Sequence, residues 1–372
     1  MSNVDGTLDR RWDHARRILV VRLDNLGDVL LMTPAIHAIR QSHPRAHIAL
    51  WTSAIGAEVA AMDPDIDEII VYEAPWMDPW HRLPQDGRRE LAMIAELRRH
   101  KFDGAIIFTS YHQSALPAAY MCYVAGIPLR LAASIDGPGS LLTTRHRHPD
   151  RMMHEVERAC DLVAAAGMRS DSLELVLTIQ PEWECALRAK LAHMGISLDH
   201  PTAVVHAGCS MPARTYSAAG FTAVADALID RLGVQVIFSG SPGERDLVER
   251  IRQGMRRRAY SVAGETSTAE LATLIRMSDL VVTNNTGPGH IAAAVHTPVV
   301  VLFALTNPPE QWHPWTEQRR LLYRQVDCAL CYARICPFNQ ECLAIPAHEV
   351  VDAAADLLTS KNEPPRKVGA RC

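Results

Sequence analysis

The chain has 372 residues, of which 48% are hydrophobic and 22% charged, a composition typical of folded globular proteins that excludes an intrinsically disordered one. A formal net charge of −4 excludes the overall positive field of a nucleic-acid-binding protein, although short basic runs occur at 98–101, 144–148 and 256–258. Because single domains usually span about 100–200 residues, the length favours two domains.

The sequence also indicates the cellular compartment of the protein. No apolar run approaches the roughly 18–20 residues that span a bilayer, and the N-terminal residues show no apolar core of an export signal. Four of the nine cysteines, Cys122, Cys160, Cys185 and Cys209, are scattered singly and form no secreted-type framework. We therefore expect a cytoplasmic protein.

The first half of the chain alternates short apolar runs with helical patterns. Strands are predicted at 17–23, 47–53, 67–72 and 102–108, and helices at 28–42 and 88–100. Such alternation is typical of βαβ units that build a parallel sheet. The expected first domain covers residues 15–178.

The pattern starts again in the second half. Strands are predicted at 202–208, 235–240, 259–264, 279–284 and 298–304, with helices at 180–196, 217–232, from Gly243, and at 268–277. We expect a second domain at 179–350 and a flexible tail at 360–372. Two doubly wound α/β domains should face each other across a cleft, with functional residues in the loops that follow the strands.

The turn after the first predicted strand carries Gly27 and Asp28. A dinucleotide-binding turn would have G-x-G-x-x-G, so the single glycine argues against a nicotinamide or flavin enzyme. Asp28 stands at a helix start, where a carboxylate caps free N–H groups. Capping is the simplest interpretation of this residue on spacing alone.

The loop after the predicted strand 279–284 has the residue types of a phosphate site. Asn285, Thr286, Gly287 and Gly289 lie where a strand ends and a helix begins, and free N–H groups at such a point bind phosphate. An Asn/Gly turn with a threonine cap is an equally simple alternative. His290, one turn into the helix, either bonds a phosphate oxygen or serves as a structural donor.

Two further loops of the second half add nucleotide-type contacts. The loop after 202–208 offers Ser210 and Arg214, and the loop after 235–240 offers Glu244. A guanidinium can neutralise a pyrophosphate without a metal, and a carboxylate can accept hydrogen bonds from ribose hydroxyls.

The segments that start at Arg22, His206 and Asn284, together with the cysteine-rich end, resemble the ADP-heptose:lipopolysaccharide heptosyltransferases, glycosyltransferase family nine, in the same order over nearly the whole chain. The resemblance implies a GT-B fold of two Rossmann-like domains, with an N-terminal acceptor domain and a C-terminal donor domain. It also implies inverting, metal-independent transfer from a nucleotide-activated heptose, with no cofactor in catalysis.

Residue roles follow from the same resemblance. Asp28 matches the family's general base, Arg214 its pyrophosphate-binding cation and Glu244 its nucleoside contact, while the donor-phosphate loop is matched by Thr286, Gly287 and His290. This chain has Asn285 where many members have Asp, so only a hydrogen-bonding role remains at that position.

The cysteine-rich end contains a C-x2-C-x4-C-x5-C run, made by Cys328, Cys331, Cys336 and Cys342. Four thiolates can hold a structural Zn²⁺ or an iron centre, and the first pair has knuckle spacing. Zinc sites usually place a longer loop between their pairs, so reduced thiols or a local disulfide are an alternative.

The resemblance predicts transfer of heptose from ADP-heptose to a sugar hydroxyl, in the lipopolysaccharide inner core, at the inner face of the cytoplasmic membrane. Another glycan, a natural product or a protein is an alternative acceptor, and a nucleotide-sugar-binding protein without transferase activity is an alternative function. Acceptor contacts are expected in variable loops at 52–60, 75–90 and 110–145, and no nucleic-acid partner is expected.

Overall fold

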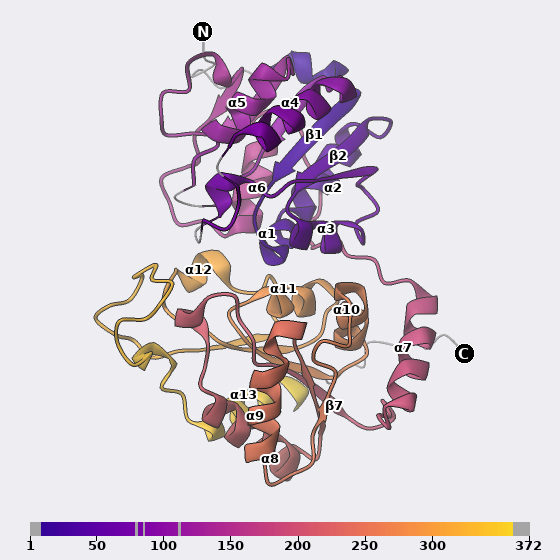
Figure 1. Cartoon of the computed structure of the whole chain (residues 1–372), viewed down its shortest axis with the longest axis vertical. Coiled ribbons are helices and arrows are strands. Elements are labelled where there is room, and N and C mark those ends of the chain that lie inside the picture. The colour runs from indigo at the N-terminus through magenta and orange to yellow at the C-terminus, as the bar shows by residue number, and fades with distance from the viewer. Residues whose placement is uncertain (1–8, 79–80, 85, 111–112, 360–372) are drawn as a thin grey trace. The chain divides into compact units, whose positions relative to one another are not determined.

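The computed structural model describes residues 9–78, 81–84, 86–110 and 113–359. The chain divides into two compact units, Met1–Thr178 and Ile179–Cys372, and each has its own parallel sheet (Figure 1). The tail predicted at 360–372 lies outside the described residues.

The sheet of the N-terminal unit has six parallel strands in the order β3-β2-β1-β4-β5-β6. They are β1 (Arg17–Arg22), β2 (His47–Thr52), β3 (Glu68–Val71), β4 (Gly104–Ile107), β5 (Leu129–Ala133) and β6 (Thr144–His146). The helices are α1 (Leu26–Leu31), α2 (Thr33–Ser42), α3 (Ala54–Ala60), α4 (Arg88–His100), α5 (Leu116–Val124) and α6 (Glu155–Ala164), with 3-10 turns at Arg10–His14, Pro75–Met77 and Gly139–Leu141.

Helices cover both faces of this sheet. Side chains alternate along β1, so Leu19 lies in an apolar cluster with Leu97 of α4, while Ile18 and Val20 are fully buried on the opposite face. Burial on both faces explains why the strands are continuous apolar runs in the sequence.

The C-terminal unit repeats this arrangement in the order β12-β11-β10-β7-β8-β9. Its strands are β7 (Thr202–His206), β8 (Gln235–Ser239), β9 (Tyr260–Ser261), β10 (Leu280–Asn284), β11 (Val299–Leu302) and β12 (Arg319–Leu322). Its helices are α7 (Pro181–His193), α8 (Ala218–Leu232), α9 (Arg245–Gly254), α10 (Thr268–Arg276), α11 (Gly287–Ala294), α12 (Pro309–Trp312) and α13 (Ala347–Thr359), with 3-10 turns at Pro212–Arg214, Pro242–Glu244 and Glu341–Leu343.

One apolar cluster joins α8, α9 and α13 to the C-terminal sheet, with Phe221, Val248 and Val350 as buried members. In both units the strand order reverses beside the first strand, between β1 and β4 and between β7 and β10. Ligands bind beyond the carboxyl ends of strands at such switch points. The two points therefore mark where functional residues are expected.

The helix predicted at 28–42 is in fact two helices, α1 and α2, separated at Met32. Pro34 has no N–H to donate to the Leu30 carbonyl, and the Thr33 hydroxyl donates to that carbonyl instead, at 2.8 Å. The segment 110–145, expected to consist of variable loops, also contains α5 and β5.

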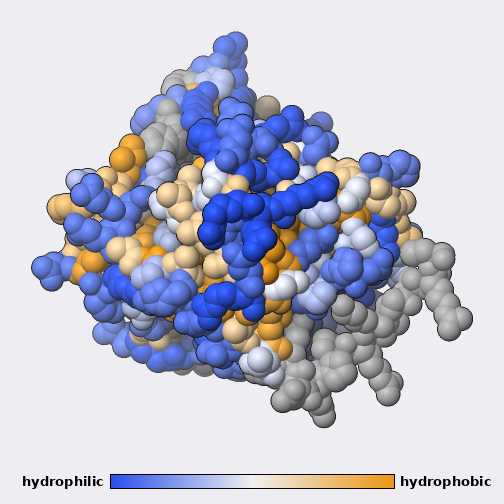
Figure 2. Space-filling view, turned by 90° about the horizontal axis from the view of Figure 1, so that it is seen from below, coloured by the Kyte–Doolittle hydropathy of each residue, from blue (hydrophilic) through white to orange (hydrophobic). Residues whose placement is uncertain are grey.

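Figure 2 shows one face of the molecule, on which hydrophilic side chains predominate and apolar ones gather in smaller areas between them. Within the described ranges, no helix combines the length and the apolar composition that crossing a bilayer requires.

Candidate active site

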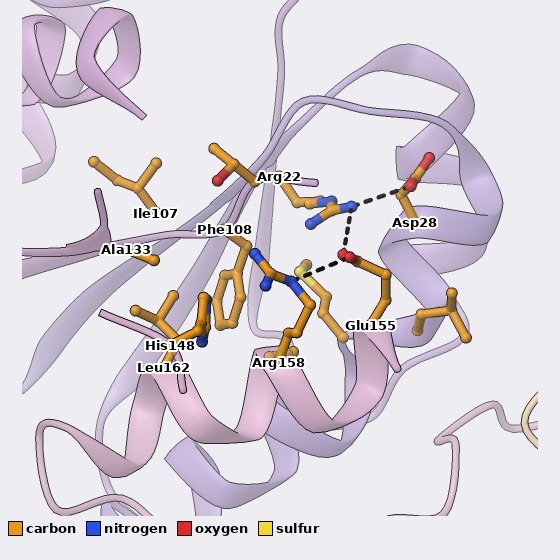
Figure 3. Close-up of a pocket in the computed structure, with 13 residues that line it drawn as sticks. Arg22, Asp28, Ile107, Phe108, Ala133, His148, Glu155, Arg158 and Leu162 are labelled. Atoms are coloured by element: carbon orange, nitrogen blue, oxygen red, sulfur yellow. Dashed lines mark hydrogen bonds and ion pairs between the residues drawn. The ribbon is translucent and has the colours of Figure 1, made fainter. Parts of the chain in front are cut away.

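Asp28 lies in the first turn of α1, beyond the end of β1. Its Oδ2 accepts a hydrogen bond from the N–H of Asn25, the N-cap residue, at 3.2 Å, which completes a capping box. The predicted capping role is therefore present, although the helix begins at Leu26, before Asp28. The other carboxylate oxygen is free of this role and points toward Arg22 (Figure 3).

Arg22 is the last residue of β1, and several acidic side chains surround its guanidinium. Its Nη2 donates to Oδ1 of Asp28 at 3.1 Å, and its Nε lies 2.7 Å from Asp24. Glu155 of α6 is 3.8 Å from the same Nη2 and 3.3 Å from Arg158 (Figure 3). Only 4% of the Arg22 side chain is exposed, so these contacts replace its hydration.

Residues after β4 complete the network. The Ser110 hydroxyl accepts from Arg22 at 2.6 Å and lies 3.3 Å from Asp28 Oδ1, and Gln113 donates to Asp24 at 2.7 Å. Burial raises the pKa of Asp24 to about 6, although the charge of Arg22 opposes the rise. Asp28 is the more accessible carboxylate, with 15% of its side chain exposed, against 5% for Asp24.

Two pockets adjoin these residues. The Asp28 pocket, lined also by His148, Glu155 and Arg158, encloses about 10 Å³, room for about one water molecule (Figure 3). A second pocket of about 270 Å³ shares Phe108 with the first, and Asp24, Trp76 and Gln113 line it. Its lining includes parts of the loops expected to contact an acceptor.

In the C-terminal unit, Glu244 folds back over the loop that follows β7. Its Oε2 accepts from the N–H of Ser241 at 2.7 Å and lies 3.8 Å from His206 Nε2. A Cβ atom at Gly208 would come within 1.9 Å of Glu244 Oε1. Glycine is therefore required at 208 for this carboxylate to occupy its place.

Arg214 connects to the loop after β10 through side chains that follow β11. Its Nε donates to the Thr306 hydroxyl at 2.9 Å, and that hydroxyl lies 3.3 Å from Asn307 Oδ1. Asn285 donates its amide to the same Asn307 oxygen at 3.1 Å. Asn285 is buried, and its side-chain amide donates a hydrogen bond. A hydrogen-bonding role without charge is what the sequence predicts for an asparagine at this position.

The start of α11 holds the other predicted phosphate-binding residues. Thr286 is the N-cap residue and Gly287 the first helical residue, both half-buried, while His290 is buried in the first turn. Thr286 hydrogen-bonds Cys209, whose thiol also lies near Arg214 and Glu244, and burial raises the pKa of this thiol. Cys209 thus lies where the three predicted donor-binding loops meet. Ser210, its neighbour, is exposed.

The model of glycosyltransferase family 9 (heptosyltransferase) matches residues 90–341, which include parts of both units. The chain belongs to this family. The glycosyltransferase is 32% identical over 328 residues to lipooligosaccharide heptosyltransferase 2 of Haemophilus influenzae, across 85% of this chain and 91% of that protein. The predicted family is therefore confirmed.

Solved structures share the fold of the glycosyltransferase. The ADP-heptose LPS heptosyltransferase II of Escherichia coli matches 93% of this chain and 100% of that one, with a TM-score of 0.74 and 20% identity. The iron-containing dodecameric glycosyltransferase TibC of enterotoxigenic E. coli H10407 matches 93% of this chain and 77% of its own chain, with a TM-score of 0.54 and 14% identity. The predicted GT-B fold of two Rossmann-like units is confirmed.

Four cysteines near the C-terminus of the glycosyltransferase line one cavity of about 30 Å³. These are Cys328, Cys331, Cys336 and Cys342. All four are free thiols, so the local disulfide is not formed. In a tetrahedral zinc site every thiolate lies about 2.3 Å from the ion. No three of these sulfurs lie within 4.8 Å of one another in the described chain, so a shared ion would require the loop to tighten.

Several residues around the two sites of the glycosyltransferase were not predicted. Arg22 ends an apolar strand, and Glu155, far along the chain, reaches it from α6. Thr306 and Asn307 follow β11 in a segment to which the family resemblance alone gave no residue role. Their position just after a buried strand was the available signal, since the carboxyl end of β11 lies at the same edge of the parallel sheet as the switch point between β7 and β10.

Proposed function

We propose that this glycosyltransferase transfers heptose from ADP-heptose to a sugar hydroxyl of the lipopolysaccharide inner core, with inversion at the anomeric carbon and without a catalytic metal. The observation that carries the proposal is that one accessible carboxylate, Asp28, lies at the switch point of the N-terminal unit, while Arg214 and the N-terminus of α11 lie at that of the C-terminal unit. Heptose transfer is the activity named for its relatives.

Asp28 is the proposed general base. Its Oδ1 accepts hydrogen bonds from Arg22 and Ser110, which hold it in one orientation, while 15% of its side chain stays exposed to an incoming hydroxyl. In the proposed step it takes the proton from the acceptor hydroxyl as that oxygen attacks C1 of the heptose. The bond between C1 and the ADP oxygen breaks in the same displacement, so the configuration inverts.

The leaving ADP is the proposed ligand of the C-terminal site. Arg214 and the positive end of the α11 dipole meet the charge that develops on the pyrophosphate, with Thr286, Gly287 and His290 around it. Glu244 and Ser210 are assigned to the nucleoside and its flanking phosphate. Because a guanidinium and a helix N-terminus supply the positive charge, the step needs no metal ion.

The acceptor site is proposed in the N-terminal unit. The pocket of about 270 Å³ beside Asp24 is lined by Trp76 and Phe108, and such aromatic walls suit the apolar faces of a sugar. A lipid-linked acceptor would bring the enzyme to the inner face of the cytoplasmic membrane. The exposed Arg98 and Arg99 in the last turn of α4 suit an anionic surface there.

Mass spectrometry of the acceptor tests the function directly. Purified protein is incubated with ADP-heptose and a heptose-free core acceptor, with and without a chelator. The proposal predicts addition of one heptose and release of one ADP, equal in both conditions, and no product with Asp28→Ala. ADP-heptose binding without turnover on any acceptor would instead indicate a nucleotide-sugar-binding protein, and loss of turnover with chelator would refute the metal-independent step.

A further inference from the structure

Two histidines and an aspartate form a compact cluster on the N-terminal unit. His146 Nε2 lies 2.6 Å and His148 Nδ1 2.7 Å from the same oxygen, Oδ2 of Asp161. All three ligand atoms lie within 4.8 Å of one another. The imidazole rings meet edge to face, with centroids 4.9 Å apart.

The local fold explains why these side chains converge. His146 ends β6, the edge strand, and His148 follows two residues later, so extended backbone places both rings on one side while Arg147 between them is exposed. Asp161 reaches the rings from the middle of α6. The cluster therefore joins a strand edge to a helix.

We propose that His146, His148 and Asp161 bind a divalent transition-metal ion of the Zn²⁺ class. Two imidazole nitrogens and one carboxylate oxygen are ligands that this class prefers, and three protein ligands leave a position for water. The side chains are 13–27% exposed, so an ion can enter while the ligands remain held by packing. The ion takes the place of the hydrogen bonds that now link the three groups.

A nearby positive charge does not oppose this site strongly. Arg158 lies close enough to influence the titration of His148, but its guanidinium is 3.3 Å from Glu155, which offsets its charge. Figure 3 shows His148 and Arg158 on the wall of the Asp28 pocket.

A metal ion bound to His146, His148 and Asp161 would fix β6 to α6, the helix that supplies Glu155 to Arg22. Its proposed role is structural, so the inference stands apart from the transfer chemistry.

Co²⁺ titration of the full-length, chelator-treated protein tests the site, since Co²⁺ replaces Zn²⁺ and absorbs visible light. We expect one equivalent of Co²⁺ to bind with a d–d spectrum that lacks thiolate charge-transfer absorption, and to raise the melting temperature. His146→Ala and His148→Ala should each weaken binding by at least roughly tenfold. His200→Ala, which removes an exposed histidine elsewhere, should bind as the wild type does.

The cysteine cluster provides the internal control. A Cys331→Ser/Cys336→Ser variant should keep the thiolate-free Co²⁺ spectrum. Absence of saturable binding to the wild-type protein would overturn the proposal, and so would binding that the histidine variants retain or that the cysteine variant loses. Should His146→Ala fail to fold, His148→Ala and Asp161→Asn decide the same question.

Discussion

The guanidinium of Arg22 lies 3.1 Å from the Asp28 carboxylate and is almost completely buried, whereas Asp28 keeps an exposed edge. The buried cation bonds Oδ1 of the proposed base while the Asn25 N–H bonds Oδ2, so the orientation of the carboxylate is fixed. The same guanidinium also contacts Ser110 and lies between Asp24 and Glu155, so its position is determined from several sides.

Arg22→Lys should reduce kcat about 10–100-fold while the KM for the nucleotide sugar stays nearly constant, because an ammonium cannot reproduce the several directed contacts of a guanidinium. Steady-state kinetics on both substrates measures the effect. Arg17→Lys is the matched control, since Arg17 starts the same strand and its side chain donates to the His100 carbonyl instead. Equal kcat values for the two variants would contradict the positioning role of Arg22.

Gly208→Ala should weaken ADP binding by about tenfold, because the new methyl group would displace the Glu244 carboxylate from its place over the loop. Isothermal titration calorimetry with ADP measures the change. Gly243→Ala is the control, as a Cβ there meets no atom within 4 Å. If Gly208→Ala binds ADP as well as Gly243→Ala does, the assignment of Glu244 to the donor is wrong.

Asn285→Asp should lower the free energy of unfolding by about 1–3 kcal/mol without raising transfer activity, since a carboxylate cannot donate to the Asn307 oxygen 3.1 Å away. Denaturant unfolding and the transfer assay measure the two effects. A variant that gains turnover over an inactive wild type would instead favour the non-catalytic binding function.

Asp63→Asn should stabilise the protein more at pH 8 than at pH 5. Burial raises the pKa of Asp63 to about 7, and its Oδ2 is buried without a hydrogen-bond partner. Between its unfolded pKa near 3.8 and about 7, the folded state holds a proton that the unfolded state releases, so wild-type stability falls as pH rises through this window. The stability gap between variant and wild type should widen by roughly 2–3 kcal/mol from pH 5 to pH 8.

Urea unfolding at both pH values provides this comparison, because the other titrating groups are common to the two proteins and cancel. A gap that stays constant with pH would show that Asp63 titrates near its ordinary pKa.

The sequence predicted the strands best where both faces of the sheet are buried, as in β1 and β10, because uninterrupted apolar runs are unambiguous there. It missed β5, β6 and β12. The short strands β6 (Thr-Arg-His) and β12 (Arg-Arg-Leu-Leu) lie at sheet edges and have few or no apolar residues, while the buried Arg130 interrupts the apolar run of β5.

The residues of the candidate site likewise fall into those that the sequence predicts and those that it does not. Residues that follow strands at the switch points, such as Asp28 and Thr286, are visible in a sequence because local turn chemistry marks them. The contact of Glu155 with Arg22 depends on how α6 packs against the sheet, and the contact of Asn285 with Asn307 depends on strand order. Neither has a local signal, so tertiary structure was needed to find them.

Replacement of Asp28 by asparagine, which keeps the shape and removes the charge, is the most direct measurement of the central claim. The proposed base role predicts a fall in kcat of about 10²–10⁴-fold for heptose transfer, with ADP-heptose affinity unchanged. Transfer by Asp28→Asn at the wild-type rate would show that Asp28 only caps its helix and that the proposed mechanism is wrong.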